Sequence, residues 1–312
     1  MGLCSDDAPN CHSPVTYSLI SPACCETGES PVWVRQESAL YWVDIPACTI
    51  YRWHAPTDQL LHWQMPEMVG SIAPCTSGRW IAAMESGIFE VALQLDGTRS
   101  FEKLATVTHP THPMRFNDGR CDRQGRFLAS SMFNDTKAGQ SVGSLYRFGL
   151  HRQLTPLHRN LIVPNGLAFS PDGNTMYLAD THASRQTVWA FDYDKDEGVP
   201  HHQRVFVDMH QHLGRPDGAA VDAAGCYWVC ASDAGLVSRF TPEGKLDRSI
   251  AVPTPKPAMC AFGGEDLDIL FVTSLRRPGS TREEDPYAGR IFAFRPGVKG
   301  LAEMAFDSRL IA

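Results

Sequence analysis

The sequence predicts an all-β protein, a six-bladed β-propeller with a central channel. Six segments repeat the same pattern of strand, turn, strand, short turn and strand. Amphipathic helical periodicity over eleven or more residues is almost absent. The same point of the repeat recurs about every 46 residues between Glu29 and Ala258. Sandwiches and barrels can also use many short strands, but they do not require this recurrence, which a propeller does.

Each repeat carries β-branched and aromatic runs bounded by Gly, Pro, Asp and Asn, which is the composition of strands and turns. The second strands are expected at residues 39–45, 79–84, 126–131, 175–180, 226–231 and 268–274. The third strands are expected at residues 49–54, 87–93, 143–148, 187–193, 235–240 and 289–294. We therefore predict a single propeller domain over residues 15–312, preceded by a loose leader over residues 1–14.

The bulk composition excludes several classes of partner. The 312-residue chain has a formal net charge of −7, which argues against nucleic acid and anionic membranes. It has no apolar run long enough to span a bilayer. Its first residues lack the basic and apolar regions of a secretory signal, so a cytoplasmic location is expected. The ten cysteines are scattered and are expected to be mostly reduced and buried. No obligate protein partner is implied.

Oxygen-bearing residues recur at one point of the repeat, eight residues before a turn glycine. Asn117, Asn165 and Asp217 precede Gly125, Gly173 and Gly225 in this way. Alignment of all six repeats adds the remaining members of the set: Glu29, Gly70 and Ala258. Equivalent positions at the start of innermost strands form a ring around one mouth of a propeller channel. The sequence thus places four oxygen donors and two small residues around the axis.

Such a ring is suited to a hard divalent cation, because carboxylate and carboxamide oxygens are its preferred ligands. Two carboxylates on one axis would otherwise repel each other. The two small residues are expected to leave room for water or substrate. Asn-Gly and Asp-Gly are also common turn dipeptides, so any one of these residues alone can be explained by turn chemistry. Four at one aligned position, including a glutamate, favour a site.

Five blocks of the sequence carry a resemblance to a known family. They are GESPVWVRQESALYWVDI (28–45), RFNDGRCDRQGRF (115–127), VPNGLAFSPDGNTMYLADT (163–181), RPDGAAVDAAGCYWV (215–229) and AFGGEDLDILFVTS (261–274). Together they resemble the gluconolactonase family, which includes regucalcin. The resemblance runs from about residue 17 to the C-terminus. It implies a six-bladed propeller that holds one divalent cation on its axis and hydrolyses sugar lactones.

The resemblance also implies roles for individual residues. The implied metal ligands are Glu29, Asn165 and Asp217, which are members of the ring found by alignment. The implied substrate contacts are Arg115 and Asn117. Asp135 stands where family members often have an acidic substrate contact, although its surroundings, SMFND, depart from the usual sequence.

The expected reaction is the opening of an aldonolactone to its sugar acid. A divalent cation can activate a water and polarise the lactone carbonyl, and Asp217 is the expected general base. Calcium is the first expectation for the cation, with zinc, manganese, magnesium and ferrous iron as alternatives. Two other functions stay open: a calcium-binding regulator without turnover, and a metal-dependent esterase or phosphotriesterase. The latter enzymes usually add a histidine near the metal, and no ring position is histidine.

Three further features of the sequence lie outside the ring. Residues 139–143, GQSVG, match a nucleophile elbow, but they lead into a strand rather than a helix, so Ser141 is not expected to be catalytic. His112 is close enough to Arg115 in sequence to be a candidate pocket residue. Cys226 and Cys230 are expected to pack in the core on one side of a strand.

Overall fold

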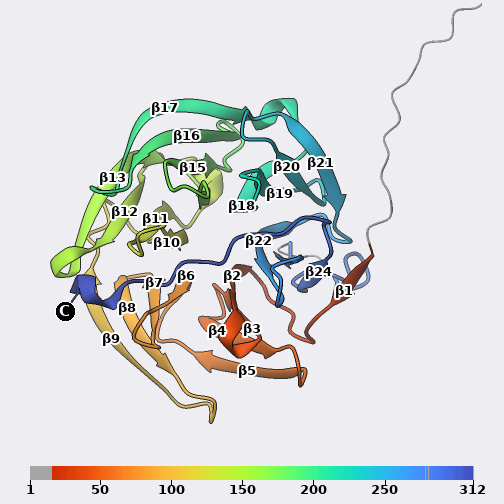
Figure 1. The fold of residues 1–312 in the computed structure, drawn as a ribbon, viewed down its shortest axis with the longest axis horizontal. Helices are drawn as coiled ribbons and strands as arrows, with labels where there is room; N and C mark the ends of the chain where they lie inside the picture. Colours follow the sequence, from red (N-terminus) through yellow and green to blue (C-terminus); the bar gives the residue numbers. More distant parts are fainter. Residues whose placement is uncertain (1–15, 278, 280, 312) are drawn as a thin grey trace, which may run out of the picture.

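The computed structural model describes residues 16–277, 279 and 281–311. In this part of the chain, six four-stranded antiparallel sheets surround a central axis (Figure 1). The predicted six-bladed β-propeller is confirmed. The leader predicted over residues 1–14 lies outside the described residues.

The strands follow one another from the axis outward in each blade. The inner strands are β2 (Gly28–Val34), β6 (Val69–Pro74), β10 (Met114–Cys121), β14 (Pro164–Phe169), β18 (Arg215–Val221) and β22 (Pro257–Gly263). The second strands are β3 (Ala39–Asp44), β7 (Trp80–Met84), β11 (Phe127–Phe133), β15 (Thr175–Asp180), β19 (Tyr227–Ser232) and β23 (Ile269–Ser274). The third strands are β4 (Thr49–His54), β8 (Gly87–Leu93), β12 (Gly143–Gly149), β16 (Thr187–Asp194), β20 (Leu236–Phe240) and β24 (Phe292–Phe294). All twelve predicted second and third strands are therefore present, although β24 begins three residues later than expected.

An outermost strand completes each blade, and the sequence pattern did not reveal it. Five of these strands are β5 (Gln59–Gln64), β9 (Arg99–Thr106), β13 (Gln153–Leu161), β17 (Val199–Asp208) and β21 (Leu246–Ala251). They lie at the rim and are largely exposed, so they carry many polar residues and lack the apolar runs of the inner strands. Short 3₁₀ turns occur at η1 (Arg35–Glu37), η2 (Thr136–Ala138), η3 (Leu150–Arg152), η4 (Met209–Gln211) and η5 (Ser308–Ile311).

The sixth blade joins the two ends of the described chain. Its outermost strand is β1 (Tyr17–Leu19), which pairs antiparallel with β24 and places Tyr17 opposite Phe294 and Leu19 opposite Phe292. The other three strands of this blade come from the C-terminal part (Figure 1). This pairing closes the ring of blades through backbone hydrogen bonds.

The core lies between neighbouring blades, where large side chains fill the space between the sheets. Trp42, Trp63 and Trp228 are fully buried. The ring of Tyr41 in the first blade packs 4.3 Å from that of Trp80 in the second, centroid to centroid. Such contacts hold neighbouring blades at fixed positions around the axis.

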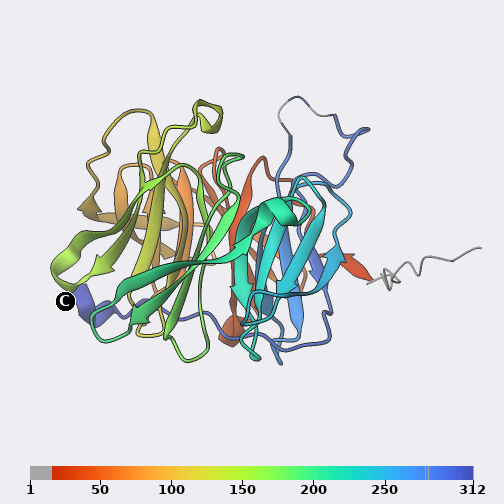
Figure 2. The same cartoon turned by 90° about the horizontal axis from the view of Figure 1, so that it is seen from above.

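Residues 299–307 run across one end of the channel, on the side opposite the loop that contains η2 (Figure 2). The backbone of Phe306 accepts a hydrogen bond from Thr76 and donates one to Pro74. Glu303 forms a 2.7 Å ion pair with Arg120 of the inner strand β10. In the described part of the chain, no helix is long and apolar enough to cross a membrane. The cytoplasmic location stays a prediction.

Candidate metal and substrate site

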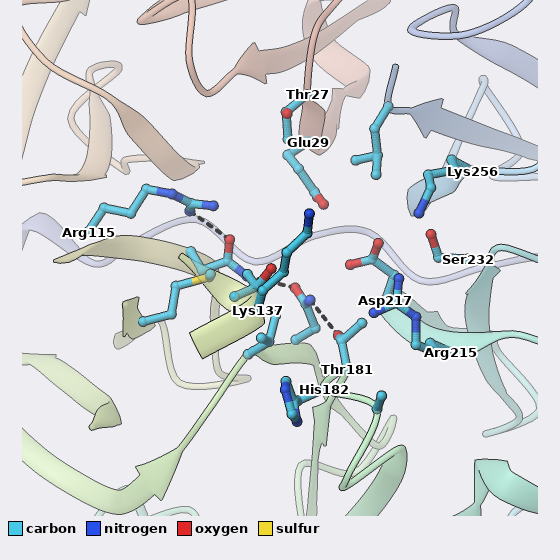
Figure 3. Close-up of a pocket in the computed structure, with 17 residues that line it drawn as sticks. Thr27, Glu29, Arg115, Lys137, Thr181, His182, Arg215, Asp217, Ser232 and Lys256 are labelled. Carbon is cyan, nitrogen blue, oxygen red and sulfur yellow. Dashed lines mark hydrogen bonds between the residues drawn. The ribbon is translucent and has the colours of Figure 1, made fainter. Parts of the chain in front are cut away.

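A cavity of about 380 Å³ lies at the uncovered end of the channel. Five of the residues singled out from the sequence line it together: Glu29, Arg115, Asn117, Asn165 and Asp217 (Figure 3). They come from β2, β10, β14 and β18, so four blades contribute to one site. The alignment of repeats therefore located residues that converge in space.

A register shift in the inner strand lies at, or directly after, each ring position. In β2 the pairing with β3 shifts between Glu29 and Val32, and in β14 it shifts between Asn165 and Ala168. The other four inner strands shift at the equivalent point. A bulge of this kind turns a side chain away from the regular alternation of a strand. This bulge explains how the ring residues can face the axis. The other side chains of the inner strands pack against the neighbouring blades.

Buried aspartates at the ends of two second strands fix the segments that lead into the ring. Asp44 accepts hydrogen bonds from the backbone N–H groups of Glu26 and Thr27, at 2.9 and 3.0 Å. Asp180 does the same for Ile162 and Val163, at 2.8 and 3.0 Å. Because these segments directly precede β2 and β14, the two aspartates set where Glu29 and Asn165 enter the channel.

The two ring carboxylates are buried without a counter-charge in direct contact. Glu29 and Asp217 each keep only 7% of their surface exposed. Neither forms an ion pair with any residue that the structure describes. Two acids in this position are costly to ionise, because burial and mutual repulsion both disfavour the charged form.

The pKa of both carboxyl groups is raised. For Glu29, burial is the main cause, and the Asp217 and Asp118 carboxylates add to it, so its pKa lies well above the ordinary value. Burial also raises the pKa of Asp217 to about 7, and Asp118 contributes to this rise. The cations Arg215 and Lys256 oppose it. A bound cation would reverse this situation by stabilising both carboxylates in their charged form.

A chain of hydrogen bonds fixes the orientation of the ring carboxamide. Asn165 donates from Nδ2 to Oγ1 of Thr181 at 2.7 Å, and this hydroxyl donates to the carbonyl of Pro216 at 2.6 Å. On its other side, Oδ1 of Asn165 accepts from Nδ2 of Asn117 at 2.9 Å. One lone pair of Oδ1 therefore remains for a ligand at the axis.

Arg115 anchors the far end of the same chain. Its Nη1 atom donates to Oδ1 of Asn117 at 2.7 Å and to the carbonyl of Phe116 at 2.9 Å. Burial lowers the pKa of Arg115 to about 10, so the guanidinium is still protonated at neutral pH. A guanidinium has five N–H donors, and those not used by these two contacts are available to a ligand in the cavity.

Asp135 and His112, by contrast, are not among the residues that line the cavity. The exposed Asp135 caps η2, accepting a 3.0 Å hydrogen bond from the backbone of Lys137. Its substrate contact stays a prediction. Ser141 donates to the carbonyl of Asn160 at 2.5 Å and lies just before strand β12, in agreement with a structural role. Both Cys226 and Cys230 are buried and free, as expected.

One of the two small ring residues, Gly70, has a packing role that was not expected. A Cβ atom on Gly70 would lie 2.5 Å from the carbonyl oxygen of Phe116 and 2.7 Å from that of Asn117. Gly70 therefore allows β6 to pack closely against the backbone of β10. Neither Gly70 nor Ala258 is among the residues that line the cavity, so room for ligand comes from elsewhere.

Several residues of the site were not found by the sequence analysis. Thr181 orients Asn165, and the buried Asp118 directly follows Asn117, with one oxygen bound to the backbone of Leu167 at 2.8 Å. The other oxygen of Asp118 has no partner among the described residues. Further residues that line the cavity are Lys137, His182, Arg215 and Lys256. Arg215 and Lys256 each stand two residues before a ring position, as Arg115 does, so the repeat could have revealed both. Lys137 and His182 lie on loops outside the repeat pattern.

The donor set fits a hard divalent cation. Nowhere in the described residues does a group of three or more His, Cys, Asp or Glu side chains form a metal site. The ring offers two buried carboxylates and one oriented amide oxygen, and these ligands suit calcium, magnesium or manganese. Three protein ligands would leave positions for water and substrate.

The comparisons with known proteins agree with this geometry. Residues 27–276 match the family model described as the SMP-30/gluconolactonase/LRE-like region. A 6-deoxy-6-sulfogluconolactonase of Pseudomonas putida is 37% identical over 282 residues, which cover 89% of this chain and 94% of that protein. A pentonolactonase of Haloferax volcanii is 32% identical over 302 residues, which cover 95% of this chain and 100% of that protein.

A solved structure gives the same result for the fold. The calcium-binding protein regucalcin of Agrobacterium tumefaciens str. C58 superposes with a TM-score of 0.86 at 25% identity, covering 94% of this chain and 98% of that one. The fold and the cavity define a six-bladed propeller with an oxygen-lined axial site. The chain belongs to the SMP-30/gluconolactonase/LRE-like family, and the resemblance seen in the sequence is confirmed. Its curated relatives include lactone-hydrolysing enzymes.

Proposed function

We propose that this chain is a metal-dependent hydrolase that opens sugar lactones to the corresponding sugar acids. One observation carries the proposal: two buried carboxylates, Glu29 and Asp217, face a cavity together with the oriented amide oxygen of Asn165. The relatives support the substrate class, since one is named for a sulfonated gluconolactone and another for pentonolactones.

Glu29, Asn165 and Asp217 would hold the cation. When bound, a divalent cation supplies Lewis-acid polarisation of the lactone carbonyl and lowers the pKa of water. Asp217 would take the proton from the attacking water through one carboxylate oxygen. Water adds to the carbonyl carbon, the ring C–O bond then breaks, and the leaving alkoxide is protonated to the hydroxyl of the acid.

Arg115 and Asn117 would orient the substrate. Arg115 lines the cavity, and its remaining N–H groups can donate to lactone oxygens. Asn117 is held between Arg115 and Asn165, so a shift of either neighbour would move it. These contacts hold the carbonyl in place, which converts binding energy into correct orientation.

A calcium-binding protein without turnover is the second candidate. The solved relative with the same fold is described as a calcium-binding protein, and the same three ligands would serve that function. Binding and turnover must therefore be measured on the same samples.

The test is hydrolysis of a panel of aldonolactones, followed with a pH indicator. Chelator-stripped protein is assayed first, and calcium, magnesium, manganese, zinc and ferrous iron are then added back separately. Activity should depend on the cation, and Asp217→Asn should lower kcat/KM by about 10²–10⁴-fold. The control Asp266→Asn replaces an exposed aspartate paired with Lys299 and should behave as wild type. Tight calcium binding without turnover of any lactone would reject the lactonase and leave the calcium-binding protein.

A further inference from the structure

The cavity contains more positive than negative charge. Four cationic side chains line it, namely Arg115, Lys137, Arg215 and Lys256, against the two carboxylates Glu29 and Asp217 (Figure 3). A divalent cation held by the carboxylates would cancel their charge. The remaining cations would then create a positive potential at the mouth, which concentrates anions.

Resting on the lactonase proposed above, we propose that the mouth of the cavity contains an anion-binding subsite, with Lys137 at its centre and Arg215 and Lys256 on the facing side. It would select sugar lactones that carry a phosphate, sulfonate or carboxylate at the end remote from the lactone carbonyl. All three groups are compact anions with several acceptor oxygens, and Lys and Arg both bind such groups.

Arg215 and Lys256 are held in place by a shared carboxylate. Asp233 lies 2.6 Å from Nη2 of Arg215 and 2.5 Å from Nζ of Lys256. One carboxylate thus serves two cations, which leaves this pair with a net positive charge beside Asp217. Because both side chains also line the cavity, they are positioned before a ligand arrives.

Lys137 approaches from the opposite side, on the 3₁₀ turn η2. Asp135 caps this turn by accepting a hydrogen bond from the backbone N–H of Lys137. This contact fixes the backbone position from which the Lys137 side chain extends. Figure 3 shows that side chain extending over the cavity. Its ammonium forms no ion pair within the part of the chain that the structure describes. An unpaired cation above the substrate cavity is suited to bind an anionic substituent.

The subsite is tested by comparing three anionic lactones with their neutral parent. The cation-loaded full-length protein is assayed with glucono-δ-lactone, 6-phosphogluconolactone, 6-deoxy-6-sulfogluconolactone and a glucarolactone. At low salt we expect kcat/KM to be at least tenfold higher for one or more of the anionic substrates. This preference should shrink as potassium chloride is raised, because salt screens exposed charges. The three anions separate phosphate, sulfonate and carboxylate as the preferred group.

Lys137→Met should lower the ratio of kcat/KM values, anionic over neutral, by about tenfold, mainly through KM. The matched control Lys245→Met removes an exposed lysine that does not line the cavity, and it should leave the ratio unchanged. Calorimetric binding of 6-phosphogluconate to wild type and Lys137→Met provides a measurement that does not depend on turnover.

The outcomes separate the two proposals. Turnover of the neutral lactone with no preference for any anionic one would overturn the subsite and leave the lactonase intact. Binding of 6-phosphogluconate that is weakened by Lys137→Met, without turnover of any lactone, would support the subsite and overturn the lactonase. An equal loss for neutral and anionic substrates in Lys137→Met would also contradict the subsite.

Discussion

The carboxamide of Asn117 donates to that of Asn165 across neighbouring blades, with 2.9 Å between Nδ2 and Oδ1. This contact, together with the 2.7 Å hydrogen bond from Asn165 to Thr181, leaves the Asn165 amide only one orientation that satisfies both neighbours. Because Nδ2 of Asn165 is bound to Thr181, its Oδ1 atom faces the axis. The proposed amide ligand is therefore pre-oriented by residues that are not themselves proposed ligands.

Replacing Thr181 tests this orientation. In Thr181→Val, Nδ2 of Asn165 loses its acceptor and the carbonyl of Pro216 loses its donor. We expect calcium affinity to fall by about 10- to 100-fold, the usual effect of removing a partner that orients a ligand. Titration calorimetry measures it directly. Thr187→Val, on the same blade, removes a hydroxyl that donates to Arg185 and should leave the affinity unchanged. An unaltered dissociation constant in Thr181→Val would show that the amide needs no such support.

Most of the architecture could be predicted from the sequence, for a physical reason. Strands that pack between blades are buried on both faces, so they appear as apolar and aromatic runs. The outermost strands are exposed at the rim, so they lack the apolar and aromatic runs of the inner strands, as β9 shows. The pairing of β1 with β24 joins segments more than 270 residues apart, and no local pattern records it.

The site was predictable only where it repeats. Glu29, Asn117, Asn165 and Asp217 share one aligned position, so their convergence followed from the symmetry of the propeller. Residues on loops outside the repeat carry no such signal: Lys137 and His182 become visible only when the loops are placed. At Gly70 the repeat led to a wrong expectation. The aligned position suggested space for ligand, but the backbone of the next blade fills that space.

Neutralising one ring carboxylate should stabilise the metal-free protein. Burial and the Asp217 carboxylate both disfavour ionised Glu29, so Glu29→Gln removes an unfavourable charge while keeping the size of the side chain. At pH 8 we expect the chelator-treated variant to melt several degrees above chelator-treated wild type. Its melting temperature should no longer rise with calcium. Differential scanning fluorimetry with and without calcium measures both effects.

The exposed Glu265→Gln serves as its control and should reproduce both wild-type melting curves. A metal-free Glu29→Gln protein that melts below wild type would mean that Glu29 makes a stabilising contact which outweighs the repulsion.

The same carboxylates predict how stability depends on pH. The pKa of Asp217 is about 7 in the folded metal-free protein, against about 3.9 in an unfolded chain. Between these values the folded state binds more protons than the unfolded state, so the stability contributed by the protonated group is present below about pH 4 and is lost as pH rises to 7. Metal-free protein should therefore melt at progressively lower temperature across this window, relative to Asp217→Asn.

Calcium must displace those protons, so its apparent affinity should increase with pH over the same window. Calorimetry in buffers of different ionisation enthalpy would count the protons released. If Asp217→Asn and wild type changed in parallel with pH, another group would be responsible for the dependence.

Adding one methyl group at Gly70 should affect both the fold and the site. The Cβ atom of Gly70→Ala would lie 2.5 Å from the carbonyl oxygen of Phe116 and 2.7 Å from that of Asn117, so β6 and β10 must separate. Overpacking of this kind costs about 1–3 kcal/mol of unfolding free energy. Because Asn117 belongs to the displaced backbone, calcium affinity should fall as well. Urea unfolding and calcium titration of Gly70→Ala beside wild type test the coupling, and a loss of stability with unchanged affinity would separate blade packing from the site.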